Sequence, residues 1–239
     1  MTDPVQEPSE NAPSEAAPLD MKRSIAKGVI GLGIFAIITA GLIALTQQMT
    51  ADTIAEQIAI ARSKALYEIV PASEHNNTIL EESFLIEAQA LGLSDVDDAY
   101  IAKLDGLPVS LILPVIAPAG YSGPIKLIVG IDTQGHIKGV RVVEHRETPG
   151  LGDKIELQKS DWIKSFDGLS LENTPSEQWK VKKDGGQFDQ LTGATITPRA
   201  IVHAILEALQ FFEVHQERLL AQTPKAIFAS QPNTLSEQP

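Results

Sequence analysis

Three threonine hydroxyls lie within six positions of one another in residues 189–198, which read DQLTGATITP. Between them, Gly193 and Ala194 are small enough to let a bulky group approach the backbone. The segment comes directly before a long amphipathic helix, whose N-terminal N–H groups and dipole favour an anion, so a phosphate would be well placed here. The local chemistry leaves one alternative open, in which Thr195 or Thr197 only caps the helix.

The first seven of these residues resemble the flavinylation motif D-x-x-(S/T)-G-A-T of the FMN-binding domain family. The resemblance implies that a flavin transferase takes FMN from FAD and esterifies its phosphate to Thr195. Thr197 is then the fallback attachment site. The implied cofactor-binding residues of the motif are Asp189, Thr192, Gly193, Ala194 and Thr195.

Other segments extend this resemblance along the chain: 120–125 (GYSGPI), 147–154 (ETPGLGDK), 182–186 (KKDGG) and an apolar segment near the N-terminus. With them, the chain is similar to the G subunit of the Rnf/Rsx electron-transport complex from about residue 22 to about residue 211. The resemblance implies an electron-transfer subunit of a membrane-bound ion-translocating oxidoreductase complex, which is not expected to turn over alone. Because covalent FMN would be attached through its phosphate, its ring would stay free to change redox state.

The resemblance also implies partners. They are the other subunits of the membrane complex, a flavin transferase for maturation, and membrane lipid around the anchor. Two alternatives stay open. One is the C subunit of a sodium-pumping NADH:quinone oxidoreductase, which uses the same motif, and the other is a flavin-free, membrane-anchored interaction module.

The loop at residues 147–154 is the predicted second wall of the flavin site. Its two glycines and its proline fix a turn in which backbone amides can face the ring or the phosphate. The alternative is a plain structural turn that closes the preceding hairpin. The implied cofactor contacts in this loop are Glu147, Thr148, Gly150, Leu151 and Gly152.

The composition narrows the possible chemistry. The formal net charge of −12 argues against a nucleic-acid partner, which requires a basic surface. The chain has no cysteine, so disulfides, iron–sulfur clusters and thiol nucleophiles are unavailable. The five histidines lack metal-binding spacing, so neither a metal site nor a catalytic residue is predicted. Redox chemistry would therefore need a cofactor held in another way.

Residues 28–46 (GVIGLGIFAIITAGLIALT) form an uncharged apolar run close to the roughly 20 residues that span a bilayer as a helix. Lys22, Arg23 and Lys27 precede it, and the next basic residue is Arg62. The positive-inside rule therefore predicts a cytoplasmic N-terminus and a periplasmic, extracytoplasmic main domain at a bacterial inner membrane. A cleaved signal peptide and a buried core helix are the alternatives.

The predicted fold class is α+β, with a single N-terminal transmembrane helix followed by one extracytoplasmic FMN-binding domain. The periodicity predicts helices over 51–69 and 198–221, strands over 107–117 broken by Pro114, and a hairpin of residues 124–132 and 137–144. The predicted divisions are a disordered cytoplasmic tail (1–20), a membrane anchor (21–49), the FMN-binding domain (51–221) and a flexible tail (222–239).

Some residues near the motifs allow more than one interpretation. Tyr121, Trp162 and Trp179 are more typical of a hydrophobic core than of a flavin-stacking position. The charged turn at 182–184 either places charge near the flavin phosphate or is an ordinary solvated turn.

Overall fold

The computed structural model describes residues 18–229, in two units that meet after Ala55 and are described separately. Helix α1 runs from Pro18 to Ile69. None of its described side chains before Ala55 is buried. The buried-core alternative for this apolar segment is therefore wrong.

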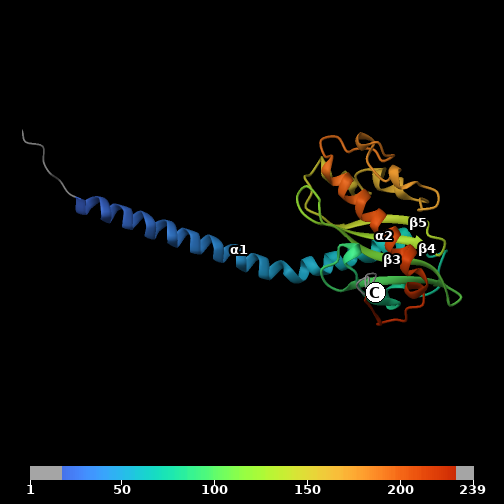
Figure 1. Ribbon diagram of the computed structural model, residues 1–239. Helices are drawn as coiled ribbons and strands as arrows, with labels where there is room; N and C mark the ends of the chain where they lie inside the picture. The colour runs from blue at the N-terminus through green and yellow to red at the C-terminus, as the bar shows by residue number, and fades with distance from the viewer. Residues whose placement is uncertain (1–17, 230–239) are drawn as a thin grey trace, which may run out of the picture. The chain divides into compact units, whose positions relative to one another are not determined.

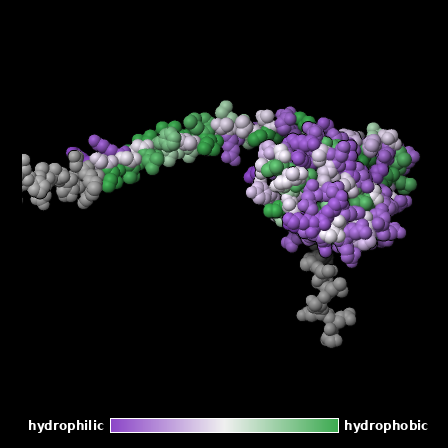
Figure 2. All heavy atoms as spheres, turned by 90° about the horizontal axis from the view of Figure 1, so that it is seen from above, coloured by the Kyte–Doolittle hydropathy of each residue, from purple (hydrophilic) through white to green (hydrophobic). Residues whose placement is uncertain are grey.

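The apolar part of α1 has the properties of a lipid-facing helix. Within the described residues, α1 is the one helix long and apolar enough to cross a membrane. The hydroxyls of Thr39 and Thr46 each donate to the carbonyl four residues earlier at 2.8 Å. These bonds satisfy polar groups that hydrocarbon could not. Figure 2 shows hydrophobic residues along this helix, whereas the face of the domain in this view is mainly hydrophilic.

A six-stranded sheet forms the centre of the domain, in the order β5-β4-β3-β2-β1-β6. Strands β1 to β5 pair antiparallel with their sequence neighbours, which confirms the predicted hairpin as β4 and β5, and β6 pairs parallel with β1. The strands are β1 (Ser83–Glu87), β2 (Asp97–Leu104), β3 (Leu107–Ala117), β4 (Ile125–Asp132), β5 (Ile137–Glu144) and β6 (Ile227–Ala229).

Helices cover both faces of this sheet. Helix α2 (Ile196–Leu220) packs on one face, chiefly against β3, as Figure 1 shows. The last turns of α1 pack on the other face, where Leu66 and Ile69 share a core with Ile112. Because successive strand residues point to opposite faces, Leu111 and Leu113 belong to the α2 core instead. The predicted α+β class is confirmed.

Pro114 does not break the extended segment, so that prediction is wrong. Strand β3 is continuous, and Pro114 pairs with Ile128 of β4. The pairing of β3 with β2 ends at Ile112. On the β2 side there is thus no ladder bond for the missing proline N–H to forfeit, and the residue is tolerated inside a central strand.

Residues 222–229 also differ from the predicted flexible tail. The amide of Lys225 donates to the Ser83 carbonyl at 2.8 Å, and β6 follows. Phe228 in β6 is only 2% exposed, with its ring 6.0 Å from that of Phe211. This buried aromatic side chain holds the segment against the domain. The predicted tails beyond residue 229 and before residue 18 lie outside the described residues.

Short 3₁₀ helices connect the larger elements, and four of them lie between β5 and α2. In this region Phe166 stacks on Phe188 with ring centroids 4.6 Å apart, and Trp179 is 3% exposed, as predicted for a core residue. The 3₁₀ helices are η1 (Ile79–Glu81), η2 (Gln89–Leu91), η3 (Gly152–Ile155), η4 (Asp161–Phe166), η5 (Ser176–Gln178) and η6 (Lys182–Asp184).

Candidate functional site

The motif segment at 189–195 makes a tight turn just before α2. The Ala194 amide donates to the Leu191 carbonyl at 2.9 Å, and Gly193 has a left-handed φ of 81°. A Cβ added at Gly193 would lie 2.8 Å from Cδ2 of Leu151. Glycine therefore allows both the backbone conformation and the close approach of the loop at 147–152.

The three threonines of the motif segment have different surroundings. Thr192 is exposed, Thr195 is half-buried at the N-cap position of α2, and Thr197 is fully buried. The Thr195 side chain makes no capping bond, and its hydroxyl has no hydrogen-bond partner among residues 18–229. Thr197 Oγ1 donates to Glu147 Oε2 at 2.5 Å. Neither side chain caps the helix, and the fallback attachment site has its hydroxyl occupied.

The loop at 147–152 is closed by hydrogen bonds to the carbonyl of Thr148. The amides of Leu151, Gly152 and Asp153 all donate to the Thr148 carbonyl, at 3.1, 3.1 and 3.4 Å. These three amides are therefore bonded within the loop, while the predicted role of the loop as a wall of the flavin site stays a prediction. The Leu151 side chain is 41% exposed, so the loop offers an apolar surface beside the motif.

Glu147 points into the domain. It is 4% exposed, and its Oε1 accepts from the Ser122 amide at 3.0 Å while Oε2 accepts from Thr197. The Glu147 amide donates to Nδ1 of His145 at 3.0 Å, so Nε2 of this ring carries the proton and donates to Glu156 Oε1 at 2.8 Å. The loop is thereby fixed at its first residue.

Two ion pairs tie η6 to the site. Lys182 Nζ lies 2.5 Å from Oδ1 of the motif residue Asp189, and Arg199 of α2 binds Asp184 through two hydrogen bonds of 2.5 and 2.7 Å. The bonds from Arg199 hold the pKa of Asp184 below its usual value, and they raise the pKa of Arg199. The charged turn is thus paired with the motif and with α2.

Trp162 supports the same turn from the other side. Its Nε1 donates to the Asp189 carbonyl at 2.8 Å, and its ring packs edge-on against Phe166 at 5.4 Å. The side chain is half-buried. It therefore joins the aromatic core to the start of the motif.

A hollow is lined in part by the residue that follows Thr195, Ile196. Its cavity volume is about 620 Å³, within the usual range for small-molecule sites. Ile196 and Arg199 of α2 line it together with Ala119, which follows β3. Tyr121 in the next turn is 67% exposed, so its predicted place in the core is wrong.

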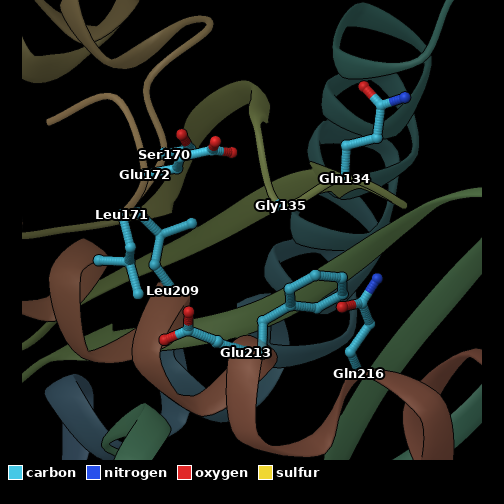
Figure 3. A pocket seen from close by; sticks show the side chains of 9 residues that line it. Gln134, Gly135, Ser170, Leu171, Glu172, Leu209, Glu213 and Gln216 are labelled. Atoms are coloured by element: carbon cyan, nitrogen blue, oxygen red, sulfur yellow. The ribbon is translucent and has the colours of Figure 1, made fainter.

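A smaller hollow of about 140 Å³ lies where the second half of α2 meets the β4–β5 turn and the 170–172 segment. Figure 3 shows Gln134 and Gly135 on one side of it, with Leu209, Glu213 and Gln216 of α2 on another. Gln216 Nε2 donates to the Thr133 carbonyl at 2.6 Å. No motif residue lines this hollow.

Comparison with known families gives two matches along the chain. Residues 21–69 match the family described as RnfG N-terminal region, and residues 120–210 match the family described as FMN-binding domain. The G subunit of an ion-translocating oxidoreductase complex from Shewanella loihica is 47% identical over 201 residues, which cover 84% of this chain and 95% of the relative. The chain belongs to this RnfG family.

Two further RnfG-family proteins, both named as G subunits of an ion-translocating oxidoreductase complex, give the same result. The relative from Pseudomonas aeruginosa is 49% identical over 84% of this chain and 94% of its own length. The relative from Vibrio cholerae is 44% identical over 83% of this chain and 95% of its own length. The RnfG N-terminal match separates this chain from the alternative of a sodium-pumping NADH:quinone oxidoreductase component.

Several residues at the site of this RnfG-family chain were missed from the sequence. Ser122 lies within the GYSGPI segment, so a signal was present, although nothing indicated that its amide binds Glu147. Ile196 and Arg199 are recognisable only as members of the first turn of α2. The pairing of Arg199 with Asp184 joins residues 15 positions apart, which no local pattern indicates.

Proposed function

We propose that this RnfG-family chain carries FMN as a phosphoester on Thr195 and relays electrons through it within a membrane-bound ion-translocating oxidoreductase complex. Its family and its FMN-binding domain make it an electron-transfer flavoprotein subunit. One observation above all supports the attachment proposal. Thr195 is the last residue of the D-x-x-T-G-A-T motif and lies at the start of α2, and its hydroxyl forms no hydrogen bond with residues 18–229.

The surroundings of Thr195 fit a phosphate on one side and a flat apolar ring on the other. The side chain of the N-cap residue Thr195 does not cap α2, which leaves the N-terminus of the helix open to an anion as far as residues 18–229 are concerned. Ile196, which lines the 620 Å³ hollow, exposes 45% of its surface, and Leu151, which lies against Gly193 of the motif, exposes 41%, so a ring could cover both. Bound there, FMN would supply reversible electron transfer at a potential set by these residues.

The proposal assigns different roles to the predicted site residues. Leu151, with Tyr121 and Ile196, would contact the ring. The motif residues Asp189, Thr192, Gly193 and Ala194 would form the turn that carries Thr195, and Glu147, Thr148, Gly150 and Gly152 would shape the second wall.

The proposed topology places residues 21–49 in the inner membrane, residues 1–20 in the cytoplasm and the FMN-binding domain, residues 51–221, in the periplasm. Lys22, Arg23 and Lys27 before the apolar run support it. Because the chain lacks cysteine, one introduced thiol reports topology cleanly. In intact cells, a membrane-impermeant maleimide should label Gln134→Cys and leave Ser9→Cys unlabelled; the reverse pattern would invert the proposed orientation.

Partners follow from the proposed role: the other subunits of the complex, lipid around the anchor, and a flavin transferase for maturation. The test is in-gel ultraviolet fluorescence of the denatured full-length chain after co-expression with a flavin transferase. We expect a fluorescent wild-type band, a dark Thr195→Val band and a fluorescent Thr192→Val control. A dark wild type beside a fluorescent flavoprotein control would refute covalent attachment and favour the flavin-free module. A fluorescent Thr195→Val band would mean that FMN is attached to a different residue.

A further inference from the structure

The carboxylate of Glu147 is buried and closely packed against two glycines. A Cβ added at Gly120 would lie 2.9 Å from Oε1, and one added at Gly152 would lie 2.8 Å from Oε2. Any side chain at either glycine would therefore press on the carboxylate. The turn that contains Gly120 and the loop that contains Gly152 thus both lie against this carboxylate.

Hydrogen bonds alone compensate the burial of this carboxylate. Its partners among the described residues are the Ser122 amide at 3.0 Å and the Thr197 hydroxyl at 2.5 Å, and no lysine, arginine or histidine of residues 18–229 forms an ion pair with it. A buried carboxylate is costly unless its acceptor positions are filled by well-placed donors. Both hydrogen bonds should therefore be strong. Loss of either one should loosen the segment that supplies its donor.

One of those segments is the start of α2. Thr197 is the second residue of the helix and lies two positions after Thr195. Its bond to Glu147 fixes the first helical turn against the loop at 147–152, and it removes the Thr197 hydroxyl from competition with Thr195. The Ser122 amide fixes the opposite side of the same carboxylate.

We propose that Glu147 is a positioning residue for flavin attachment, which holds the first turn of α2 so that the hydroxyl of Thr195, and not that of Thr197, is presented to the flavin transferase. This inference rests on the proposed function. In the transfer, Thr195 Oγ forms a bond to the FMN phosphorus of FAD, the pyrophosphate bond breaks, AMP leaves and the hydroxyl proton passes to solvent. Glu147 touches none of the reacting atoms, and it acts through Thr197.

The test is a time course of flavin incorporation into the full-length protein, with purified flavin transferase and FAD. We expect Glu147→Gln to slow incorporation about tenfold, which corresponds to the loss of one charged hydrogen bond. Thr197→Val should slow it similarly, whereas Thr197→Ser, which keeps the hydroxyl, should restore the wild-type rate. Glu144→Gln is the matched control. Glu144 lies three residues before Glu147 and forms an ion pair with Lys126 at the surface.

Peptide mapping by mass spectrometry separates positioning from general destabilisation. In Glu147→Gln, part of the flavin should move to Thr197, an outcome that a merely weakened fold would not produce. The inference is refuted if folded Glu147→Gln incorporates flavin at the wild-type rate on Thr195 alone. If that variant does not fold, equal rates for Thr197→Val and Thr197→Ser refute it instead. Failure of wild type to incorporate flavin refutes the proposed function itself.

Discussion

Arg199 in the first turn of α2 donates two hydrogen bonds to Asp184 in η6, at 2.5 and 2.7 Å. These bonds hold the pKa of Asp184 below its usual value. A carboxyl group whose pKa is lower in the folded state stabilises the fold above its unfolded pKa, and this contribution is lost as the pH falls through the folded pKa. The pair therefore stabilises the motif region at neutral pH and stops doing so in acid.

Replacing Arg199 with glutamine should raise the pKa of Asp184 toward the ordinary aspartate value of about 3.9. The acid side of the melting-temperature profile should flatten accordingly, because the folded and unfolded pKa values converge. Carbon NMR titration of the Asp184 carboxyl measures the first effect, and melting below about pH 5 measures the second. Lys164→Gln, which removes an exposed pair with Asp161, is the control. An unchanged Asp184 titration in Arg199→Gln would contradict the prediction.

Substitution of Gly193 should destabilise the fold for two separable reasons. A left-handed φ costs a residue with a Cβ about 1 to 2 kcal/mol, and at Gly193 the new Cβ would also meet Leu151 at 2.8 Å. Gly193→Ala should therefore lower the melting temperature more than Gly185→Ala, because Gly185 has a similar φ of 86° and open space around it.

The Leu151→Ala background isolates the contact. There, Gly193→Ala should cost about as much as Gly185→Ala, since only the backbone penalty remains. Thermal melting of the four proteins gives the coupling free energy directly. Additive effects of Gly193→Ala and Leu151→Ala would mean that the two residues do not touch.

Local patterns predicted the elements in which side-chain periodicity and turn chemistry agree. The β4–β5 hairpin and α2 are examples, because their apolar spacing continues to the turn residues that end them. Pro114 was predicted wrongly because the cost of a proline in a strand depends on whether a partner strand lies opposite, and only the register supplies that information. Phe228 was missed because its apolar run, residues 226–229 (AIFA), is too short to show a periodicity.

In the candidate site, too, local motifs could be predicted from the sequence and long-range contacts could not. Thr195 was predicted from a contiguous motif and Glu147 from its loop, whereas the hydrogen bond between Glu147 and Thr197 joins residues 50 positions apart. Tyr121 was assigned to the core by residue type, although its side chain is 67% exposed. Contacts between distant segments follow from the tertiary fold, and single-sequence patterns do not contain them.

The packing of α1 on the sheet depends on Gly130 in β4. A Cβ added there would lie only 2.2 Å from Cγ2 of Ile69. Gly130→Ala should therefore destabilise the domain by about 1 to 3 kcal/mol through overpacking. In contrast, Gly139→Ala would place its Cβ 3.5 Å from Cγ1 of Ile69, an ordinary contact, and should be much milder. Chemical denaturation of the full-length protein in detergent compares the two, and equal losses would contradict this account.

Strand β6 should contribute to stability although it has only three residues. Phe228 is 2% exposed, lies 6.0 Å from the ring of Phe211, and has the guanidinium of Arg218 4.7 Å from its centroid. Phe228→Ala should thus cost about 3 to 5 kcal/mol, as for other buried aromatic side chains. Ile227→Ala is the matched control, because Ile227 is its neighbour in the same strand and is 67% exposed.

Denaturation midpoints of both variants decide whether residues 222–229 belong to the fold. If Phe228→Ala melts like Ile227→Ala, the segment contributes nothing and its pairing with β1 is dispensable. If only Phe228→Ala is destabilised, the C-terminal strand belongs to the same cooperative unit as α2, because its anchor contacts Phe211 on that helix. Removal of the strand would then weaken the helix whose first turn carries the proposed flavin site.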